Sequence, residues 1–169
     1  TLQVIAVMGY IKERKENSHF LVVCPVSLLE NWKREISKFY PSFTTYLHYG
    51  ARRTGDYREL LKYDITIMSY SSAIADAGML TMTNWDLLVI DEAQNIKNPR
   101  AKRTKAIKQI NRDVPIAITG TPFENHMTDI WSIVDFVMPG FLGNLNQFEM
   151  FFEDDLDSAV RLEKLITPL

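Results

Sequence analysis

Two adjacent carboxylates, Asp91 and Glu92, follow the apolar run at residues 87–90. The run has the composition of a strand buried on both faces, as in a parallel sheet. A strand that ends in acids places them at the sheet edge where α/β proteins bind ligands. Two carboxylates there can hold Mg²⁺ and orient a water, the two tasks that phosphoryl transfer assigns to acidic side chains. The pair could instead cap the following helix, so taken alone it leaves both roles open.

A second polar group ends the apolar segment at residues 115–120. Gly120 permits a tight turn, and the hydroxyls of Thr119 and Thr121 can donate and accept hydrogen bonds at the end of a strand. Beside the carboxylates of the preceding strand, these hydroxyls could sense whether a phosphate is present. The alternative is an ordinary turn in which Pro122 begins a helix.

The segment at residues 21–32 places a strand end, a proline, a serine and a helix start in a row. Ser27 and Glu30 have the spacing of a capping box, which predicts that Ser27 is the N-cap of the helix. A helix N-terminus with free backbone N–H groups binds phosphate readily. An ordinary strand-to-helix turn explains the same pattern.

Strand-like and helix-like patterns alternate along the chain. The predicted strands are residues 19–25, 44–50, 64–70, 86–91 and 115–120. The predicted helices are residues 2–15, 28–40, 56–61, 100–110, 127–137, 146–152 and 158–166, with a further short helix after the third strand. This alternation implies an α/β fold with a parallel sheet covered on both faces. The break at residues 138–143 separates an α/β part, 1–137, from a helical part, 138–169.

Composition places the chain among globular domains. Its 169 residues are 46% hydrophobic and 24% charged, and a chain of this length can bury a core. No apolar run approaches the ~20 residues that cross a bilayer, so we expect no membrane partner. The single cysteine, Cys24, excludes an internal disulfide, and its apolar surroundings predict a buried thiol in a reducing, intracellular setting.

Charge is unevenly distributed although the net charge is only -2. One segment without any acid carries six basic residues, Lys97, Arg100, Lys102, Arg103, Lys105 and Lys108. Two interpretations stay open for this segment: a solvated helix face and a contact with a phosphate backbone. By contrast, the segment at residues 152–157 is acidic.

The order of these segments resembles the first motor lobe of the Swi/Snf-type ATPases, within helicase superfamily two. The family pattern appears as CPVSLLENW, IMSYSS, DEAQNIKNP and TGTPFENHMTDIW, its motifs Ia, Ib, II and III, and PGFLGNLNQFEMFF is similar to the sequence after that lobe. The resemblance implies a RecA-like fold and ATP-driven movement along double-stranded DNA. The wording of DEAQNIKN and FVMPGFLG resembles bacterial members, which implies the cytoplasm and its nucleoid.

The resemblance also implies roles for single residues. Asp91 would act on ATP-bound Mg²⁺, often through water, and Glu92 would orient or deprotonate the attacking water. Gln94 stands where many relatives carry His, and it would bond between the nucleotide and motif III. The residues that would couple the nucleotide state to the movement of the lobes are Thr119, Gly120 and Thr121. Residues in motifs that face the nucleic-acid backbone are Ser27, Leu28, Ser69 and Tyr70, with Lys97 and Asn98 after motif II.

The first residues of the sequence carry a further implication. The family's phosphate loop reads Gly-x-Gly-Lys-Thr, usually followed by Leu-Gln, and this sequence starts with Thr1, Leu2 and Gln3. We therefore expect Thr1 to end that loop and to serve ATP and Mg²⁺, with the loop lysine, the preceding strand and the second motor lobe absent. The expected protein is a translocase fragment that is inactive alone and binds ATP and Mg²⁺ weakly. Its strand at 115–120 would have an unpaired flank that favours self-association.

Two other classes compete with this interpretation. An autonomous α/β module could hold nucleic acid without ATP through motifs Ia and Ib and the basic helix. A response-regulator-like or flavodoxin-like domain could use Asp91 as an acceptor, but such domains need several acids near the first strand, and the early segments offer none.

Overall fold

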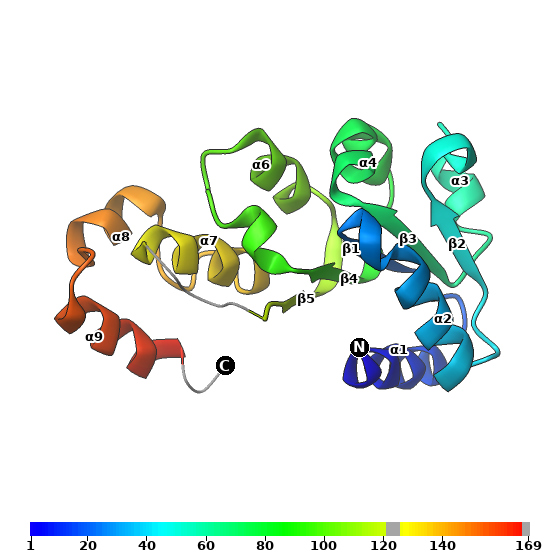
Figure 1. The fold of residues 1–169 in the computed structure, drawn as a ribbon, viewed down its shortest axis with the longest axis horizontal. Coiled ribbons are helices and arrows are strands. Elements are labelled where there is room, and N and C mark those ends of the chain that lie inside the picture. Colours follow the sequence, from blue (N-terminus) through cyan, green and yellow to red (C-terminus); the bar gives the residue numbers. More distant parts are fainter. Residues whose placement is uncertain (121–125, 167–169) are drawn as a thin grey trace.

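A five-stranded parallel sheet in the order β2-β3-β1-β4-β5 forms the centre of the chain (Figure 1). The computed structural model describes residues 1–120 and 126–166. The strands are β1 (Phe20–Cys24), β2 (Thr45–His48), β3 (Ile65–Ser69), β4 (Trp85–Asp91) and β5 (Arg112–Ile118). All residues of β1 and β3 are buried, because each strand has neighbours on both sides and helices on both faces.

Helices cover both faces of this sheet, as the alternating pattern predicts. They are α1 (Leu2–Arg14), α2 (Leu29–Phe39), α3 (Tyr57–Leu60), α4 (Tyr70–Ala75), α5 (Ala77–Leu80), α6 (Lys102–Lys108), α7 (Met127–Val137), α8 (Leu145–Phe151) and α9 (Leu156–Ile166). The described residues also form the short 3-10 turns η1 (Val26–Leu28), η2 (Gly50–Arg52) and η3 (Ala93–Ile96). No helix in the described ranges is long and apolar enough to cross a membrane.

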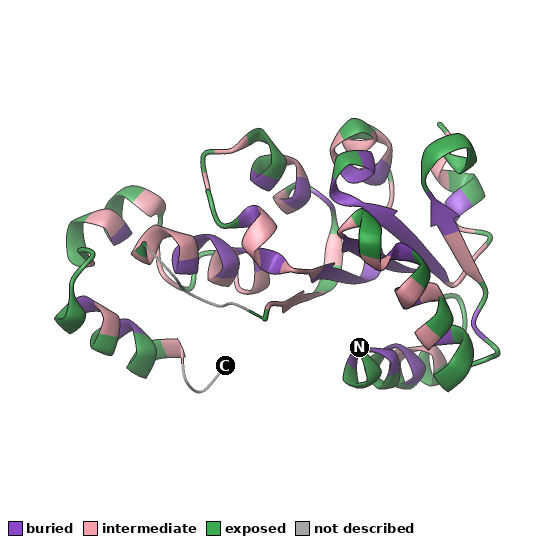
Figure 2. Cartoon of the chain, viewed as in Figure 1, coloured by how far each residue is buried: buried purple, intermediate pink, exposed green. Residues whose placement is uncertain are grey.

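Alternate residues of each strand belong to different cores. Leu21 and Val23 pack in a cluster with side chains of α4, α5, α6 and α7, whereas Phe20 and Val22 pack with side chains of α1 and α2. The two clusters lie on opposite sheet faces because successive side chains of a strand point in opposite directions. Figure 2 shows the buried residues concentrated in the strands and in the helix faces turned toward them.

The helical end of the chain has its own apolar cluster. Ile130 and Trp131 of α7 pack with Phe148 of α8 and Leu162 of α9. Helix α7 also packs on β5 and η3, so it connects this cluster to the sheet. The division of the chain at residue 138 stays a prediction.

The structure corrects three local predictions. Ser27 is not an N-cap: it lies inside η1, and α2 continues from that turn without a side-chain cap. The basic helix is shorter than predicted, since α6 spans Lys102–Lys108. Strand β5 starts earlier, at Arg112, because it pairs with β4 from Trp85 onward and an edge strand tolerates polar residues and Pro115.

Candidate active site

The two predicted polar groups meet at the carboxyl end of the sheet. Asp91 is in register with Ile118, so the residues that follow β4 and β5 lie side by side. The Thr119 hydroxyl donates to Gln94 Oε1 at 3.1 Å, which joins the two strand ends directly. Gly120 follows Thr119 at an exposed position. Thr121 lies outside the described residues.

The carboxylate of Asp91 is oriented by one donor at each oxygen. Trp32 Nε1 donates to Oδ2 at 2.8 Å, and the backbone N–H of Glu92 donates to Oδ1 at 2.9 Å. Each oxygen keeps lone-pair capacity for one more partner. The side chain is partly exposed, so a hydrated cation can approach it.

Glu92 has an unusual backbone. With φ 52° and ψ 58° it is left-handed, and it is the one residue other than glycine with positive φ among those the structure describes. Its carbonyl accepts from the backbone N–H of Asn95 at 3.0 Å and from Asn95 Nδ2 at 2.9 Å, which holds the turn. Strained residues of this kind persist where the surroundings impose them, and they cluster at functional sites.

Gln94 bridges the two strand ends. Its Nε2 donates to Glu92 Oε2 at 2.6 Å, while its Oε1 accepts from Thr119. The carboxylate can only accept, so the amide nitrogen must face Glu92 and the amide oxygen must face Thr119. The bridge therefore fixes the direction of both neighbours, and the expected bond from Gln94 to a nucleotide stays a prediction.

The donor set fits Mg²⁺ bound together with phosphate. Within the described residues, no group of three or more His, Cys, Asp and Glu side chains could hold a metal ion. Mg²⁺ usually binds through one or two carboxylates and keeps several waters alongside substrate phosphates, so Asp91 is a sufficient carboxylate contribution and Glu92 is left to orient a water. A closed structural metal site would need more protein ligands.

Thr1 lies at the start of α1, and its side chain makes no capping hydrogen bond to that helix. A groove of about 430 Å³ runs between α1 and β5, lined by Gln3 at one end of α1 and by Thr119 after β5, among others. The beginning of α1 thus shares a groove with Thr119. The role expected for Thr1 at ATP and Mg²⁺ stays a prediction.

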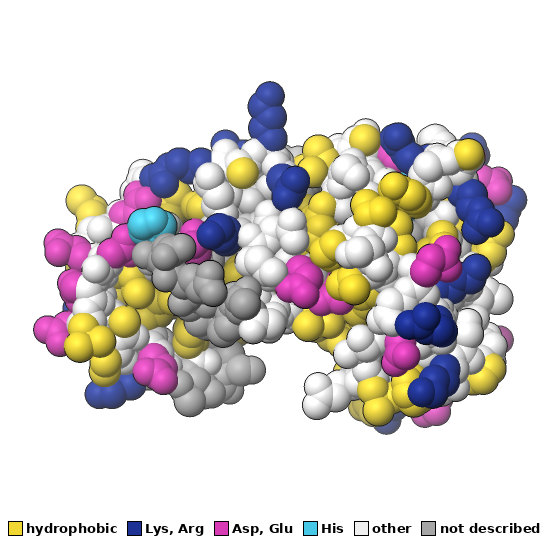
Figure 3. All heavy atoms as spheres, in the orientation of Figure 1, with side chains coloured by type: hydrophobic (Ala, Val, Ile, Leu, Met, Phe, Trp, Pro, Cys, Tyr) yellow, Lys and Arg dark blue, Asp and Glu magenta, His cyan; other side chains and the backbone are white. Residues whose placement is uncertain are grey.

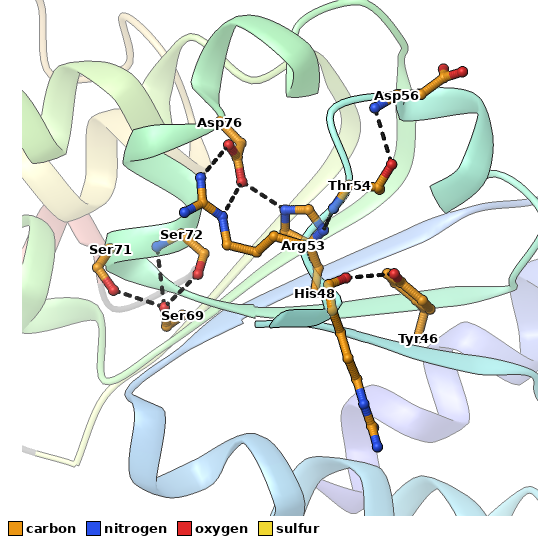
Figure 4. A network of polar contacts seen from close by, with 10 residues as sticks. Tyr46, His48, Arg53, Thr54, Asp56, Ser69, Ser71, Ser72 and Asp76 are labelled. Carbon is orange, nitrogen blue, oxygen red and sulfur yellow. Dashed lines mark hydrogen bonds and ion pairs between the residues drawn. The ribbon is translucent and has the colours of Figure 1, made fainter. Parts of the chain in front are cut away.

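The residues predicted to face nucleic acid differ in exposure. Ser27 is exposed and Leu28 partly buried in η1, after β1. Ser69, the last residue of β3 and the N-cap of α4, is buried, and so is Tyr70, the first residue of α4. The exposed hydroxyl of this turn belongs to Ser71, whose Oγ lies 2.9 Å from Ser69 Oγ (Figure 4). Sequence reasoning missed Ser71, although it is part of the IMSYSS motif.

The basic segment divides into exposed and paired charges. Lys102, Arg103 and Lys105 are exposed, and Figure 3 shows basic side chains over α6 at one edge of the molecule. Lys108 is instead paired with Asp135 at 2.7 Å, and burial lowers the pKa of its amine. Lys108 therefore fits neither interpretation of the basic segment, the solvated helix face or the contact with a phosphate backbone. Its ion pair ties α6 to α7 instead.

Lys97 and Asn98 are both exposed just after η3. Lys97 Nζ lies 3.6 Å from Asp129 Oδ2, and Asn98 Oδ1 accepts from the backbone N–H of Arg100 at 2.9 Å. Arg100 itself pairs with Glu149 of α8 at 2.8 Å. The segment after η3 is therefore held against α7 and α8, with Lys97 at its surface.

A buried histidine was also missed. His48 ends β2, and its Nε2 lies 2.7 Å from Asp76 Oδ2, while Arg53 makes two hydrogen bonds to the same carboxylate at 3.0 and 2.6 Å (Figure 4). The backbone N–H of Thr54 donates to His48 Nδ1 at 3.4 Å, so the proton of a neutral ring lies on Nε2. This network ties the loop after β2 to the end of α4, beside the serine cluster of Ser69, Ser71 and Ser72.

We expect Asp76→Asn to lower the free energy of unfolding by about 1–3 kcal/mol at neutral pH, because the buried His48 and the exposed Arg53 both lose a charged acceptor. Burial raises the pKa of Asp76, but hydrogen bonds from Arg53 and His48 outweigh burial and the net pKa is lowered. The ionised carboxylate therefore stabilises the fold fully above its ordinary pKa of 3.8, and this stabilisation is lost as pH falls from there through the lowered pKa of the folded state.

Urea denaturation at pH 7 and at pH 3 measures this difference. The difference in the free energy of unfolding between wild type and Asp76→Asn should be smaller at pH 3 than at pH 7. The control is Glu59→Gln, which removes an exposed ion pair with Lys62 and should leave the midpoint unchanged. An equally stable Asp76→Asn at pH 7 would contradict the prediction.

Cys24 is a free thiol that is buried at the end of β1, as predicted. Burial, with a smaller contribution from the negative charge of Asp91, raises the pKa of Cys24 to about 12. A thiol in that state is protonated at neutral pH and is a poor nucleophile.

Comparison with known proteins matches the whole chain. The sequence pattern of the family described as "SNF2-related domain" covers residues 1–169. The "Putative ATP-dependent helicase/translocase YwqA" of Bacillus subtilis is 38% identical over 99% of this chain and 19% of its own length. The "Chromatin-remodeling ATPase INO80" of Gibberella zeae is 31% identical over 94% of this chain and 9% of its own length.

One solved structure confirms the predicted fold class. The "Sulfolobus solfataricus SWI2/SNF2 ATPase core in complex with dsDNA" has a TM-score of 0.86 and 38% sequence identity, and the match covers 98% of this chain and 36% of that chain. The chain described here spans less than a fifth of the two curated relatives above. The five-stranded parallel sheet that the alternating pattern predicts is therefore the RecA-like sheet that the family resemblance implies.

Proposed function

The chain belongs to the SNF2-related domain family, and from that premise we propose that it is part of an ATP-dependent motor that moves along double-stranded DNA. The observation that carries the proposal is the hydrogen-bonded line from Asp91 through Glu92 and Gln94 to Thr119 across the carboxyl edge of the sheet. Such a line would connect a phosphoryl-transfer site at the end of β4 with Thr119 after β5, which would respond to the state of the nucleotide.

The roles of the acidic residues follow from their contacts. Mg²⁺-ATP, when bound, would supply the phosphoryl group that is transferred to water. Asp91 would accept hydrogen bonds from water held by the metal, since both its oxygens are already oriented. Glu92 would orient the attacking water and take its proton, while Gln94 fixes the carboxylate of Glu92. The free hydroxyl of Thr1 would face the metal from the start of α1.

Coupling and DNA contact are assigned to the surrounding turns. Thr119, Gly120 and Thr121 would pass the nucleotide state to the movement of a second motor lobe in the whole protein. The residues proposed to face the DNA backbone are Ser27, Leu28, Ser69, Tyr70, Lys97 and Asn98. The buried Ser69 and Tyr70 would hold the turn in place, and the exposed Ser71 would offer the hydroxyl. The DNA named with the Sulfolobus structure supports DNA as the partner.

Domain boundaries and location complete the proposal. Residues 1–137 would form the first motor lobe, and residues 138–169 would lead toward the second lobe. The similarity to a Bacillus subtilis protein favours a bacterial protein of the cytoplasm and nucleoid.

We expect ATP hydrolysis by the full-length protein to rise severalfold with double-stranded DNA. The 169-residue chain alone should not hydrolyse ATP above a Glu92→Gln control and should bind Mg²⁺-ATP weakly, because its sequence contains no Gly-Lys pair to grip the phosphates. Steady-state assays with and without DNA measure both expectations. A hydrolysis rate of the full-length protein that does not change with DNA would contradict the first expectation. Hydrolysis by the 169-residue chain above the Glu92→Gln control would contradict the second.

DNA titration of the 169-residue chain at two salt concentrations tests the alternative of an ATP-independent binding module. A module of that kind would keep clear affinity at physiological salt, with a slope of about -0.9 per neutralised phosphate. We expect weak, non-specific binding instead.

We also expect the isolated chain to self-associate through β5. In the part of the chain that the structure describes, β5 pairs only with β4. Its open edge lies between two grooves of about 360 and 430 Å³, and Ile116 and Ala117 line both. An unpaired strand edge with apolar flanks favours pairing with a second copy.

Sedimentation over a hundredfold range of protein concentration measures this association. Val114→Lys should shift the chain toward monomer, because Val114 is 40% exposed on β5 and a charge there opposes edge pairing. The control Met82→Lys places the same charge at an exposed site outside β5. A wild-type chain that stays monomeric throughout would contradict the prediction.

A further inference from the structure

Two buried aromatic side chains meet at Asp91. Trp32 of α2 is 1% exposed, and its Nε1 donates to Asp91 Oδ2 at 2.8 Å. Tyr70, the first residue of α4, is 5% exposed, and its hydroxyl donates to the backbone carbonyl of Asp91 at 2.7 Å. One donor therefore orients the carboxylate, and the other holds the backbone that carries it.

The two donors reach Asp91 from opposite faces of the sheet. Trp32 packs in the cluster with side chains of α1 and α2, whereas Tyr70 packs in the cluster with α4, α5, α6 and α7. A movement of either helical layer relative to β4 would thus change a hydrogen bond at Asp91. Aromatic rings transmit such movements well because they are rigid and fill their packing sites.

Each donor is also attached to a segment that would face DNA. Trp32 lies in α2, which continues directly from η1 with Ser27 and Leu28. Tyr70 follows Ser69 and precedes the exposed Ser71 at the end of β3. Each of these segments is thus connected to Asp91 through a single side chain, Trp32 for η1 and Tyr70 for the start of α4.

We propose that Trp32 and Tyr70 are positioning residues through which the DNA-facing segments η1 and the start of α4 set the orientation of Asp91. The proposal rests on the proposed function, because it needs Asp91 at the metal and DNA at those two segments. Without the Trp32 donor, Oδ2 is free to turn away, and metal binding in the correct geometry becomes less favourable. Without the Tyr70 donor, the end of β4 is held less firmly.

A merely structural role for the two aromatics makes a different prediction. Buried Trp N–H and Tyr O–H groups generally have partners, and loss of such a bond lowers stability. A folded variant would then keep the Mg²⁺ requirement and the DNA stimulation of the wild type. A positioning role changes both in protein that is still folded.

The test uses the full-length protein with Trp32→Phe, Tyr70→Phe and the control Trp85→Phe. Each replacement removes one buried donor and keeps an aromatic ring. Trp85 is a matched control because it is fully buried on β4 and donates to the carbonyl of Leu80 at 3.2 Å, away from Asp91. ATP hydrolysis is measured against Mg²⁺ concentration, with and without double-stranded DNA, and thermal unfolding of every variant is recorded.

We expect Trp32→Phe to raise the Mg²⁺ concentration for half-maximal hydrolysis about 10-fold, the usual scale for loss of a partner that orients a metal ligand. Tyr70→Phe should lower the ratio of DNA-stimulated to basal rate, and the control should change neither quantity. If Trp32→Phe and Tyr70→Phe both keep the Mg²⁺ requirement and the DNA-stimulation ratio of the wild type, the inference is overturned. DNA stimulation of the wild-type protein would still support the proposed function in that case. A wild-type protein without DNA stimulation would overturn both.

Misfolding of one variant does not remove the test. If Trp32→Phe unfolds, the DNA-stimulation ratio of Tyr70→Phe decides, and an unchanged ratio overturns the inference. If Tyr70→Phe unfolds, the Mg²⁺ requirement of Trp32→Phe decides in the same way.

Discussion

Glu92→Gln should lower the rate of DNA-stimulated ATP hydrolysis by the full-length protein by about 10²–10⁴-fold, the usual contribution of a general base. The amide keeps the shape of the side chain, and its oxygen can still accept from Gln94 Nε2, so the line to Thr119 should persist. What is lost is the group that takes the proton of the attacking water. Steady-state hydrolysis at saturating Mg²⁺-ATP and DNA measures the effect.

Two further measurements make the result specific. Nucleotide binding by Glu92→Gln should stay within about threefold of wild type, since the proposed role of Glu92 is in the chemical step. The control is Glu30→Gln, an exposed acid in the first turn of α2, which should leave the rate unchanged. Retention of more than a tenth of the rate by Glu92→Gln would exclude Glu92 as the base.

Trp85→Ala should lower the free energy of unfolding of the 169-residue chain by about 3–5 kcal/mol, as expected for a large buried aromatic. Trp85 is fully buried at the start of β4, where it belongs to the cluster under α4 to α7. Its removal leaves a cavity and also leaves the carbonyl of Leu80 without the Trp85 Nε1 donor. Equilibrium urea denaturation at low protein concentration, followed by circular dichroism, measures the loss.

The exposed neighbour Met82 provides the matched control. Met82 is 66% exposed three residues before Trp85, and Met82→Ala should change the free energy of unfolding by no more than about 0.5 kcal/mol. A loss below about 1 kcal/mol in Trp85→Ala would show that this end of the sheet repacks and that the core is less tightly defined than its burial indicates.

Much of the fold follows from local patterns. Strands β1, β3 and β4 read as apolar runs because each is buried on both faces, and that pattern does not depend on knowing their neighbours. Parallel strands deliver their carboxyl ends to one edge, so the meeting of Asp91 with Thr119 could be predicted before any distance was known. The unpaired flank of β5 also agrees with prediction in the described part of the chain.

Predictions from local patterns were wrong where another turn or another side chain took the place of the expected interaction. Ser27 has the spacing of a capping box, but η1 takes up the first turn and α2 needs no side-chain cap. Lys108 has the composition of an exposed basic face, yet Asp135 of α7 pairs with it. For Ser27 the competing structure is the local 3-10 turn itself. For Lys108 the competing partner belongs to tertiary packing, which spacing along the chain does not encode.

Strand periodicity and chain order are enough to predict which chemical groups stand at the carboxyl edge of the sheet. How Asp91 is held depends on packing, since its donors Trp32 and Tyr70 come from 59 and 21 residues away. Packing also places His48 in the interior beside Asp76. Hydrogen-bond partners of buried groups are chosen by contacts between distant segments, whereas strands and helices are favoured by residues close in the chain.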